Sequence, residues 1–169
     1  MKVLETERLV LRRVTAEDDA FILELLNDPE WIRFIGDRGI RTLEGARDYI
    51  TNSFLAMYER HGFGLYLTEL KGEGVPVGIC GLIKRDSLAD VDVGFAFLPQ
   101  FRGKGYGYES AAAVLEYGRK TFGLKRIVAI TSPDNGVSAA LLEKLGFTYE
   151  GMIELSAGGG RVSLFASGG

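Results

Sequence analysis

The sequence predicts a single α/β domain, and three observations lead to this fold class. The chain has 169 residues, enough for one compact core and too few for two domains of ordinary size. Hydrophobic residues make up 46% and charged residues 25%, the balance of a folded globular protein. Strand-like segments occur before, between and after helix-like segments, an order typical of a mixed sheet covered by helices. We expect one domain over residues 1–169.

The first half of the chain carries signals for one strand, two helices and three further strands. Thr15 is an N-cap residue, and the apolar positions after it recur at helical spacing until Asp28-Pro29 stops the helix. Thr42 supplies a second N-cap. The expected elements are a strand at 9–11, a helix at 15–27, a loop at 31–41, a helix that begins at 42 and includes 57, and strands at 63–70, 76–84 and 91–98.

The second half begins with a glycine-rich loop and then alternates helices with strands. Residues 108–121 have helical periodicity and end before Gly123, a common C-terminal stop. A further helix ends at Gly146 in the same way. The expected elements are helices at 108–121 and 138–145 and strands at 126–131, 147–153 and 161–166, which brings the totals to about seven strands and four helices.

Charge and cysteine content limit the classes of partner. The 20 basic and 23 acidic side chains give a net charge of −3, which argues against nucleic acid and leaves room only for a small phosphate-rich ligand. Cys80 is the only cysteine, so neither a disulfide nor a thiolate metal cluster forms within one chain, and we expect no metal. The N-terminus does not resemble a signal peptide and no segment is apolar enough to span a membrane, so we expect a cytoplasmic protein without a membrane partner.

The glycine-rich loop, Arg102-Gly103-Lys104-Gly105-Tyr106-Gly107, has the composition of a phosphate-binding turn. Its glycines let backbone N–H groups converge at the start of the next helix, where the helix dipole and two basic side chains attract an anion. Lys104 is followed by glycine rather than Ser or Thr, which excludes a P-loop, and Tyr108 breaks the dinucleotide fingerprint. A diphosphate site and a simple flexible turn are the two interpretations left open.

Further motifs are spread over nearly the whole chain. They are Glu5-Thr6-Glu7-Arg8-Leu9-Val10-Leu11-Arg12, Val93-Gly94-Phe95, the glycine-rich loop, Asn135, Ser138 and Glu143-Lys144-Leu145-Gly146-Phe147. In this order they resemble the GNAT acetyltransferase superfamily, and more narrowly its RimJ/RimL-like group of ribosomal-protein N-terminal acetyltransferases. The resemblance implies a mixed, mostly antiparallel sheet that splays between the strands expected at 91–98 and 126–131, the fourth and fifth along the chain.

The resemblance also implies that acetyl-CoA is the co-substrate. In the family an Arg/Gln-x-x-Gly-x-Gly/Ala motif binds the CoA pyrophosphate, and Arg102, Gly105 and Gly107 occupy its positions. The strand ending at Leu98 would pair with pantetheine through main-chain groups, and Asn135 would hydrogen-bond pantetheine, with an N-cap as its alternative role. The implied cofactor contacts are Phe97, Leu98, Arg102, Gly103, Lys104, Gly105, Tyr106, Gly107, Tyr108, Asn135 and Ser138.

Catalytic groups follow from the same resemblance. Asp92 precedes Gly94-Phe95 and matches a family carboxylate base, with a solvated acid at a strand end as the alternative. Leu142 stands where many members have a tyrosine acid, so Ser138, directly or through water, is the matching proton donor unless it only satisfies a helix start. The main-chain N–H of Leu98 is the implied oxyanion donor.

The acceptor is expected to be a primary amine, and Trp31, Phe34 and Tyr58 are candidate pocket side chains, with core packing as their alternative. A peptide or protein N-terminal α-amine is favoured, because roughly a tenth of α-amines but about one lysine in two thousand is neutral at pH 7. The alternatives are a small amine such as a polyamine or antibiotic, a non-catalytic CoA-binding regulatory module and a nucleotide-binding protein. The family group is compatible with a homodimer.

Overall fold

The sheet is the centre of the structure, a computed structural model that describes residues 2–155 and 160–168. Eight strands lie in the order β1-β2-β3-β4-β5-β6-β8-β7. All neighbouring strands are antiparallel except β5 and β6, which are parallel. The strands are β1 Lys2–Glu5, β2 Leu9–Arg13, β3 Leu65–Leu70, β4 Pro76–Ile83, β5 Asp92–Phe97, β6 Ile127–Thr131, β7 Thr148–Glu154 and β8 Arg161–Ser167.

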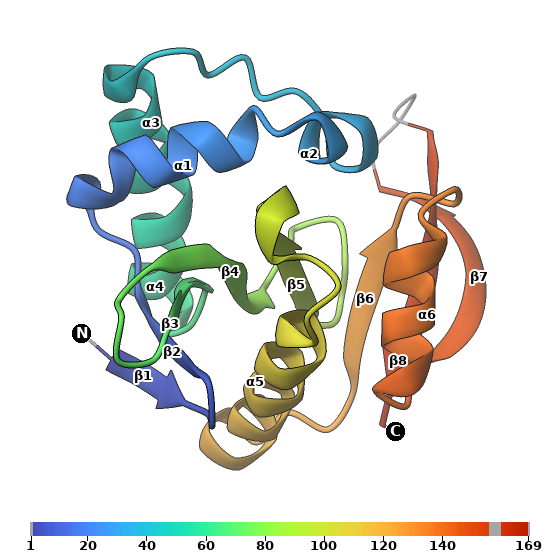
Figure 1. The fold of residues 1–169 in the computed structure, drawn as a ribbon. Coiled ribbons are helices and arrows are strands. Elements are labelled where there is room, and N and C mark those ends of the chain that lie inside the picture. The colour runs from blue at the N-terminus through green and yellow to red at the C-terminus, as the bar shows by residue number, and fades with distance from the viewer. Residues whose placement is uncertain (1, 156–159, 169) are drawn as a thin grey trace.

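The sheet opens between β5 and β6, as the sequence predicted. These two strands pair only where Asp92 lies opposite Val128, and from there they diverge (Figure 1). On its other side β5 pairs with β4 along its whole length. The main-chain groups on one edge of β5 are therefore directed toward a space that no neighbouring strand fills.

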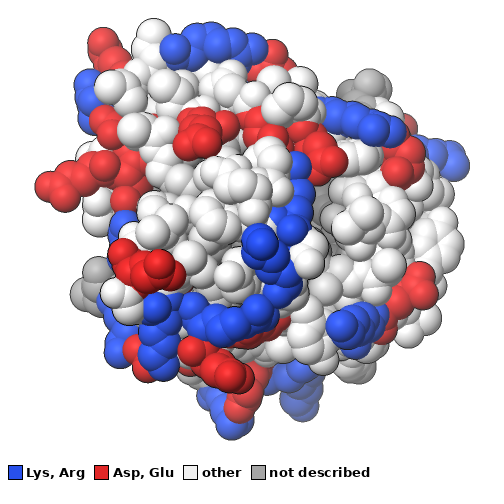
Figure 2. Space-filling model, in the orientation of Figure 1, with Lys and Arg blue, Asp and Glu red and all other residues white. Residues whose placement is uncertain are grey.

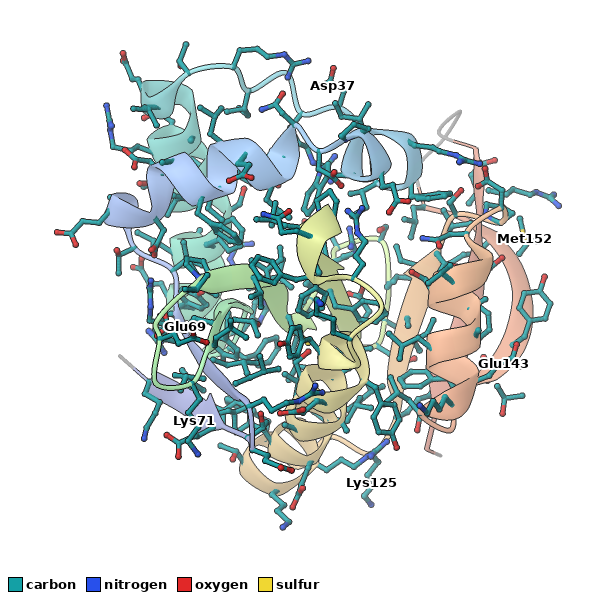
Figure 3. The ribbon with its side chains drawn as sticks, viewed as in Figure 1. Asp37, Glu69, Lys71, Lys125, Glu143 and Met152 are labelled. Carbon is teal, nitrogen blue, oxygen red and sulfur yellow. The ribbon has the colours of Figure 1, made fainter. Side chains whose placement is uncertain are left out.

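Strand β1 was not predicted from the sequence. It is a four-residue edge strand that pairs with β2. Lys71, labelled in Figure 3, forms an ion pair with this strand, since its Nζ lies 3.0 Å from Glu5 Oε2. Short charged edge strands give little periodic signal, because one face meets solvent and charges protect the edge.

The helices flank the sheet (Figure 1). The long helix α5 packs on β4 and β5, and α6 packs on β6. Among the described residues no helix is long and apolar enough to cross a membrane. The helical segments are η1 Ala16–Asp18, α1 Asp19–Leu26, α2 Pro29–Phe34, α3 Leu43–Tyr49, the π-helical η2 Ile50–Leu55, α4 Ala56–His61, η3 Pro99–Phe101, α5 Tyr106–Phe122 and α6 Gly136–Lys144.

The prediction of a loop from residue 31 to 41 was wrong over its first part. Asp28 and Pro29 end α1, as expected, but they also start α2: the Asp28 carboxylate accepts a hydrogen bond from Trp31 N at 3.3 Å, and Pro29 is the first helical residue. The same two residues are thus a stop and a start signal. Helix α5 likewise begins at Tyr106, two residues before the predicted position.

The core lies between the sheet and the helices and uses the predicted apolar positions. Ile22, Leu25 and Leu26 of α1 are buried, as their helical spacing indicated. Tyr58 of α4 stacks on Tyr66 of β3 with ring centroids 5.7 Å apart.

Candidate active site

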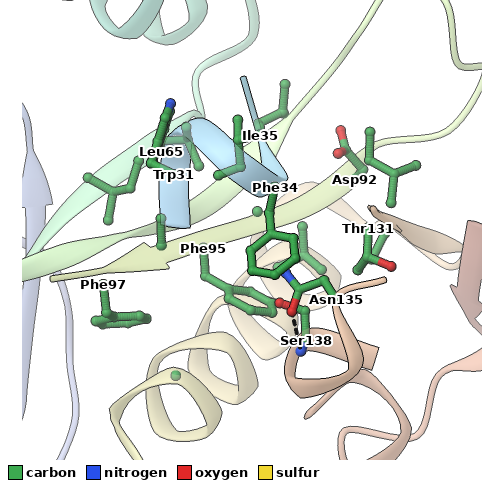
Figure 4. A pocket seen from close by; sticks show the side chains of 18 of the residues that line it. Trp31, Phe34, Ile35, Leu65, Asp92, Phe95, Phe97, Thr131, Asn135 and Ser138 are labelled. Atoms are coloured by element: carbon green, nitrogen blue, oxygen red, sulfur yellow. Dashed lines mark hydrogen bonds between the residues drawn. The ribbon is translucent and has the colours of Figure 1, made fainter. Parts of the chain in front are cut away.

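A large cleft runs through the opening between β5 and β6. Its volume is about 1640 Å³, and its lining includes all of β5, the end of β6, the glycine-rich loop, α2 and the starts of α5 and α6. Figure 4 shows Asp92 and Thr131 near one end of this space, Asn135 and Ser138 below Phe95, and Phe34 in front of the opening. The cleft therefore brings together residues from both halves of the chain.

The glycine-rich loop forms the turn between β5 and α5. Gly103 and Gly105 have φ values of +74° and +86°, a left-handed conformation that other residues rarely adopt, and Gly105 is the N-cap of α5. At Gly107 an added Cβ would lie 3.1 Å from Leu141 Cδ2. The first N–H groups of a 17-residue helix have no intrahelical acceptors, so this helix start is suited to a diphosphate.

The N-terminal segment holds this loop in place, a role that sequence reasoning missed. Glu109 of α5 accepts hydrogen bonds from Thr6 Oγ1 at 2.5 Å, Arg8 N at 2.9 Å and Arg8 Nε at 2.6 Å. Arg8 Nη1 also donates to the carbonyl of Lys104 at 2.9 Å. The conspicuous Thr6-Glu7-Arg8 motif is thereby connected to the loop, a long-range contact that no local pattern reveals.

The Arg102 side chain is directed to two carboxylates at the start of α2. Its Nη2 forms an ion pair with Asp28 Oδ2, and its Nη1 lies 2.7 Å from Glu30 Oε2. Basic side chains nevertheless form a band across the middle of this face, over the connection between β5 and α5, with acidic side chains beside it near α2 (Figure 2). The expected role of Arg102 as a direct cofactor contact therefore conflicts with the partners that its side chain has.

The N–H of Leu98 is also occupied, which contradicts its expected role as oxyanion donor. It donates to the carbonyl of Val77 at 2.9 Å and so belongs to the pairing of β4 with β5. Because main-chain groups alternate along a strand, Phe95 and Phe97 direct their N–H groups to the opposite edge. Val91 has this same orientation, since its carbonyl accepts from Val128 N of β6 at 3.0 Å.

Asp92 lies at the point where β5 and β6 diverge. It is only 1% exposed, its Oδ2 lies 3.3 Å from Arg85 Nε, and its Oδ1 is buried without a hydrogen-bond partner among the described residues. Burial raises the pKa of the Asp92 carboxyl from 3.8 to about 6, although the nearby Arg85 guanidinium opposes the change. The alternative of a solvated strand-end acid is wrong, because this carboxyl is buried.

Asn135 and Ser138 lie at the start of α6 on the opposite wall. Asn135 Oδ1 accepts a hydrogen bond from Ser138 N at 3.2 Å, so Asn135 is an N-cap (Figure 4). Its Nδ2 donors are not used by this cap. Both residues are half-buried and line the cleft. The capping and ligand-binding interpretations of Asn135 are therefore compatible.

The three aromatic candidates for the acceptor pocket are placed differently. Trp31 and Phe34 of α2 line the cleft. Tyr58 is absent from its lining; it is 4% exposed, and its hydroxyl accepts from Val14 N at 3.0 Å and donates to the carbonyl of Leu65. The expectation for Tyr58 is wrong, because the core uses both its ring and its hydroxyl.

Two further cleft residues bear on the chemistry. Leu142 is fully buried and lines the cleft, so an apolar side chain occupies the position of the family tyrosine. Thr131 ends β6, lines the cleft and was not singled out from the sequence, although a hydroxyl at the end of a strand beside the expected splay could have indicated it (Figure 4). The Leu142 position itself therefore supplies no proton donor.

Comparison with known proteins identifies the family. The acetyltransferase (GNAT) domain model matches residues 8–148. The chain is 31% identical over 154 residues to the uncharacterized N-acetyltransferase YoaA of Bacillus subtilis strain 168, covering 89% of this chain and 85% of that protein. It is also 31% identical over 106 residues to the [ribosomal protein uS5]-alanine N-acetyltransferase of Escherichia coli K12, covering 63% of this chain and 54% of that protein.

Solved structures have the same fold. The GNAT-family acetyltransferase from Bacillus anthracis superposes with a TM-score of 0.80 at 27% identity, covering 99% of this chain and 98% of that one. RimL, a ribosomal L7/L12 alpha-N-protein acetyltransferase in complex with coenzyme A, gives a TM-score of 0.83 at 18% identity over 99% and 98% of the chains. The chain belongs to the GNAT acetyltransferase family, whose members use acetyl-CoA, and it is an N-acetyltransferase.

Proposed function

We propose that this enzyme acetylates the α-amine of a peptide or protein N-terminus, with the glycine-rich loop as the site of the acetyl-CoA pyrophosphate. The observation that carries the choice of acceptor is the charge of the cleft. Its lining contains seven basic and five acidic side chains, although the whole chain has a net charge of −3. An excess of basic over acidic side chains disfavours polyamines and other polycations more than it disfavours the single charge of a peptide N-terminus.

Basic side chains are also present at the end of the cleft near Asp92, where the acceptor amine would bind. Lys84 and Arg85 follow β4, at the end of the sheet opening where Asp92 begins β5, and Arg60 of α4 also lines the cleft. Asp92 is itself paired with Arg85, and Asp86 is the other acid of this end. The name of the uS5-alanine relative, which refers to N-acetylation of an alanine of a ribosomal protein, supports the same choice.

Asp92 is suited to accept the proton of an α-amine. With a pKa of about 6, its carboxylate is mostly ionised at neutral pH. An α-amine has a reference pKa near 7.8, so the proton transfer, directly or through one water, spans only about two pKa units. Its buried Oδ1, which has no partner among the described residues, is the available acceptor atom.

The remaining steps use groups along the same opening. The N–H groups of Phe95 and Phe97, on the β5 edge that faces β6, would stabilise the negative oxygen that forms when the amine attacks the thioester carbonyl. Ser138, directly or through water, would return a proton to the departing thiolate. Asn135 Nδ2 would hold the pantetheine chain, since its Oδ1 is used by the α6 cap. A cytoplasmic location belongs to the same proposal, because the one cysteine is buried and unpaired.

An acceptor panel with acetyl-CoA tests the proposal. Thiol release is measured with short peptides that have free N-termini, with the same peptides blocked at the N-terminus but containing one lysine, with spermidine and with an aminoglycoside. We expect release with the free N-termini and mass-spectrometric localisation of the acetyl group there. Release with spermidine alone would instead support a small-amine acetyltransferase, and CoA binding without any release would support a regulatory module.

A further inference from the structure

Arg102 of the glycine-rich loop forms ion pairs with residues at the start of α2. Both terminal nitrogens of the Arg102 guanidinium have carboxylate partners, Asp28 and Glu30. The Asp28 side chain is only 4% exposed and that of Arg102 is 32% exposed. One terminal nitrogen pairs with the buried Asp28 carboxylate and the other with the exposed Glu30 carboxylate, and these two ion pairs leave the guanidinium little capacity for a phosphate.

The partners of Arg102 are also the beginning of α2. Asp28 caps this helix by accepting a hydrogen bond from Trp31 N, and Glu30 lies in its first turn. Helix α2 carries Trp31 and Phe34, which line the cleft, and Phe34 lies in front of the opening between β5 and β6 (Figure 4). At the other end of α2, Arg33 and Asp134 are 3.5 Å apart and well exposed, so this second connection is weak.

We propose that Arg102 is a positioning residue that holds α2 against the loop between β5 and α5, and thereby sets the acceptor wall of the cleft. The loop then binds the diphosphate with its backbone and with Lys104, while the Arg102 side chain connects the donor half of the site to the acceptor half. This inference rests on the proposed function for the identity of the two ligands. The contact between the loop and α2 does not depend on it.

The chain provides a reporter for α2, because Trp31 is its only tryptophan. Its ring is 6% exposed, so movement of α2 changes its emission and its quenching by acrylamide. The main variants are Arg102→Ala and Asp28→Asn, the second of which keeps an oxygen that can cap α2 while it removes the charge. Lys104→Ala is the matched control, since it removes a neighbouring loop cation that has no bond to α2. Circular dichroism establishes that each variant is folded.

Three readouts distinguish a positioning residue from a phosphate ligand: CoA affinity by calorimetry, Trp31 quenching and acceptor KM. We expect Arg102→Ala and Asp28→Asn to increase Trp31 quenching about twofold and acceptor KM about tenfold, with CoA affinity within about threefold of wild type. Lys104→Ala should weaken CoA by roughly threefold to tenfold without changing Trp31.

The opposite pattern overturns the inference. If Arg102→Ala weakens CoA more than Lys104→Ala does, while Trp31 quenching stays at the wild-type value in both Arg102→Ala and Asp28→Asn, then Arg102 is a phosphate ligand. Failure of the wild-type enzyme to bind CoA would count against the proposed function instead, and the quenching result would still decide whether Arg102 positions α2.

Discussion

Replacement of Asp92 by asparagine separates a catalytic from a structural role for this buried acid. In the native state the pKa of the Asp92 carboxyl is about 6, whereas in the unfolded chain the carboxyl has its ordinary pKa of 3.8. The native protein therefore loses stability as pH rises from about 4 to about 6, and it keeps this penalty at higher pH. A difference of about two pKa units corresponds to about 3 kcal/mol.

Asp92→Asn removes this penalty while it keeps the shape of the side chain. We expect the variant to be more stable than wild type at pH 8 by up to about 3 kcal/mol, which is about 6 to 12 °C in Tm for a chain of this size. The gain shrinks toward zero below pH 4, where both side chains are neutral. Loss of the charged contact with Arg85 makes the full value an upper limit.

The same variant should be a poor enzyme. We expect kcat to fall by about 10² to 10⁴, because the amine loses its proton acceptor. In wild type, log kcat/KM against pH should show two ascending limbs, near 6 for Asp92 and near 7.8 for the α-amine, and Asp92→Asn should keep only the second. Asp86→Asn, at the same end of the cleft, is the control and should keep both limbs.

Two results would refute this reasoning. Lower stability of Asp92→Asn at pH 8 would mean that the ionised carboxylate stabilises the fold, contrary to the effect of its burial. A wild-type pH profile that Asp92→Asn leaves unchanged would mean that another group takes the proton. Thermal denaturation from pH 3.5 to 8 and initial rates over the same pH range supply both measurements.

Three further predictions concern the loop and the core. Gly105→Glu should abolish measurable CoA binding in calorimetry. Gly72→Glu is the control and should bind CoA normally, because Gly72 has the same φ of +86° in a remote turn and nothing lies within 4 Å of a Cβ added there. Equal loss of CoA binding in both variants would show that the loop is not the cofactor site. Tyr58→Phe should lower the free energy of unfolding, measured by urea denaturation, by about 1 to 3 kcal/mol, because the Tyr58 hydroxyl is hydrogen-bonded to Val14 N and to the Leu65 carbonyl. Acceptor KM should stay unchanged, and a changed KM would show that Tyr58 belongs to the acceptor pocket. Glu109→Gln should lower the free energy of unfolding by about 1 to 2 kcal/mol in the same assay and should weaken CoA binding. Unchanged CoA affinity would show that the Arg8 contacts do not position the loop.

Local signals in the sequence were sufficient for most of the fold. The caps at Thr15 and Thr42 and the glycine at 123 mark helix ends in the structure. Short elements were the ones missed. Strand β1 has four residues and α2 has six, so neither repeats a pattern often enough to be recognised.

Features of the site that depend on local backbone conformation were predictable from the sequence. Features that depend on contacts between distant segments were not. Glycines at 103 and 105 predicted the positive φ angles and a helix that follows the loop, although the helix begins two residues earlier than predicted. The partner of Arg102 is 74 residues away in sequence, so its ion pair with Asp28 could not be read from either segment. The N–H of Leu98 was misassigned for a related reason, since only the pairing register with β4 decides which edge of β5 each main-chain group faces.

The central claim is that an α-amine, and not a polycation, reacts in the cleft. The most direct measurement is competition between a free-N-terminal peptide and spermidine for acetyl-CoA, with products quantified by mass spectrometry at pH 7.5. We expect the acetyl group on the peptide α-amine, and we expect Asp92→Asn to remove this product without loss of CoA binding. Acetylspermidine as the main product, with no acetylated peptide, would contradict it.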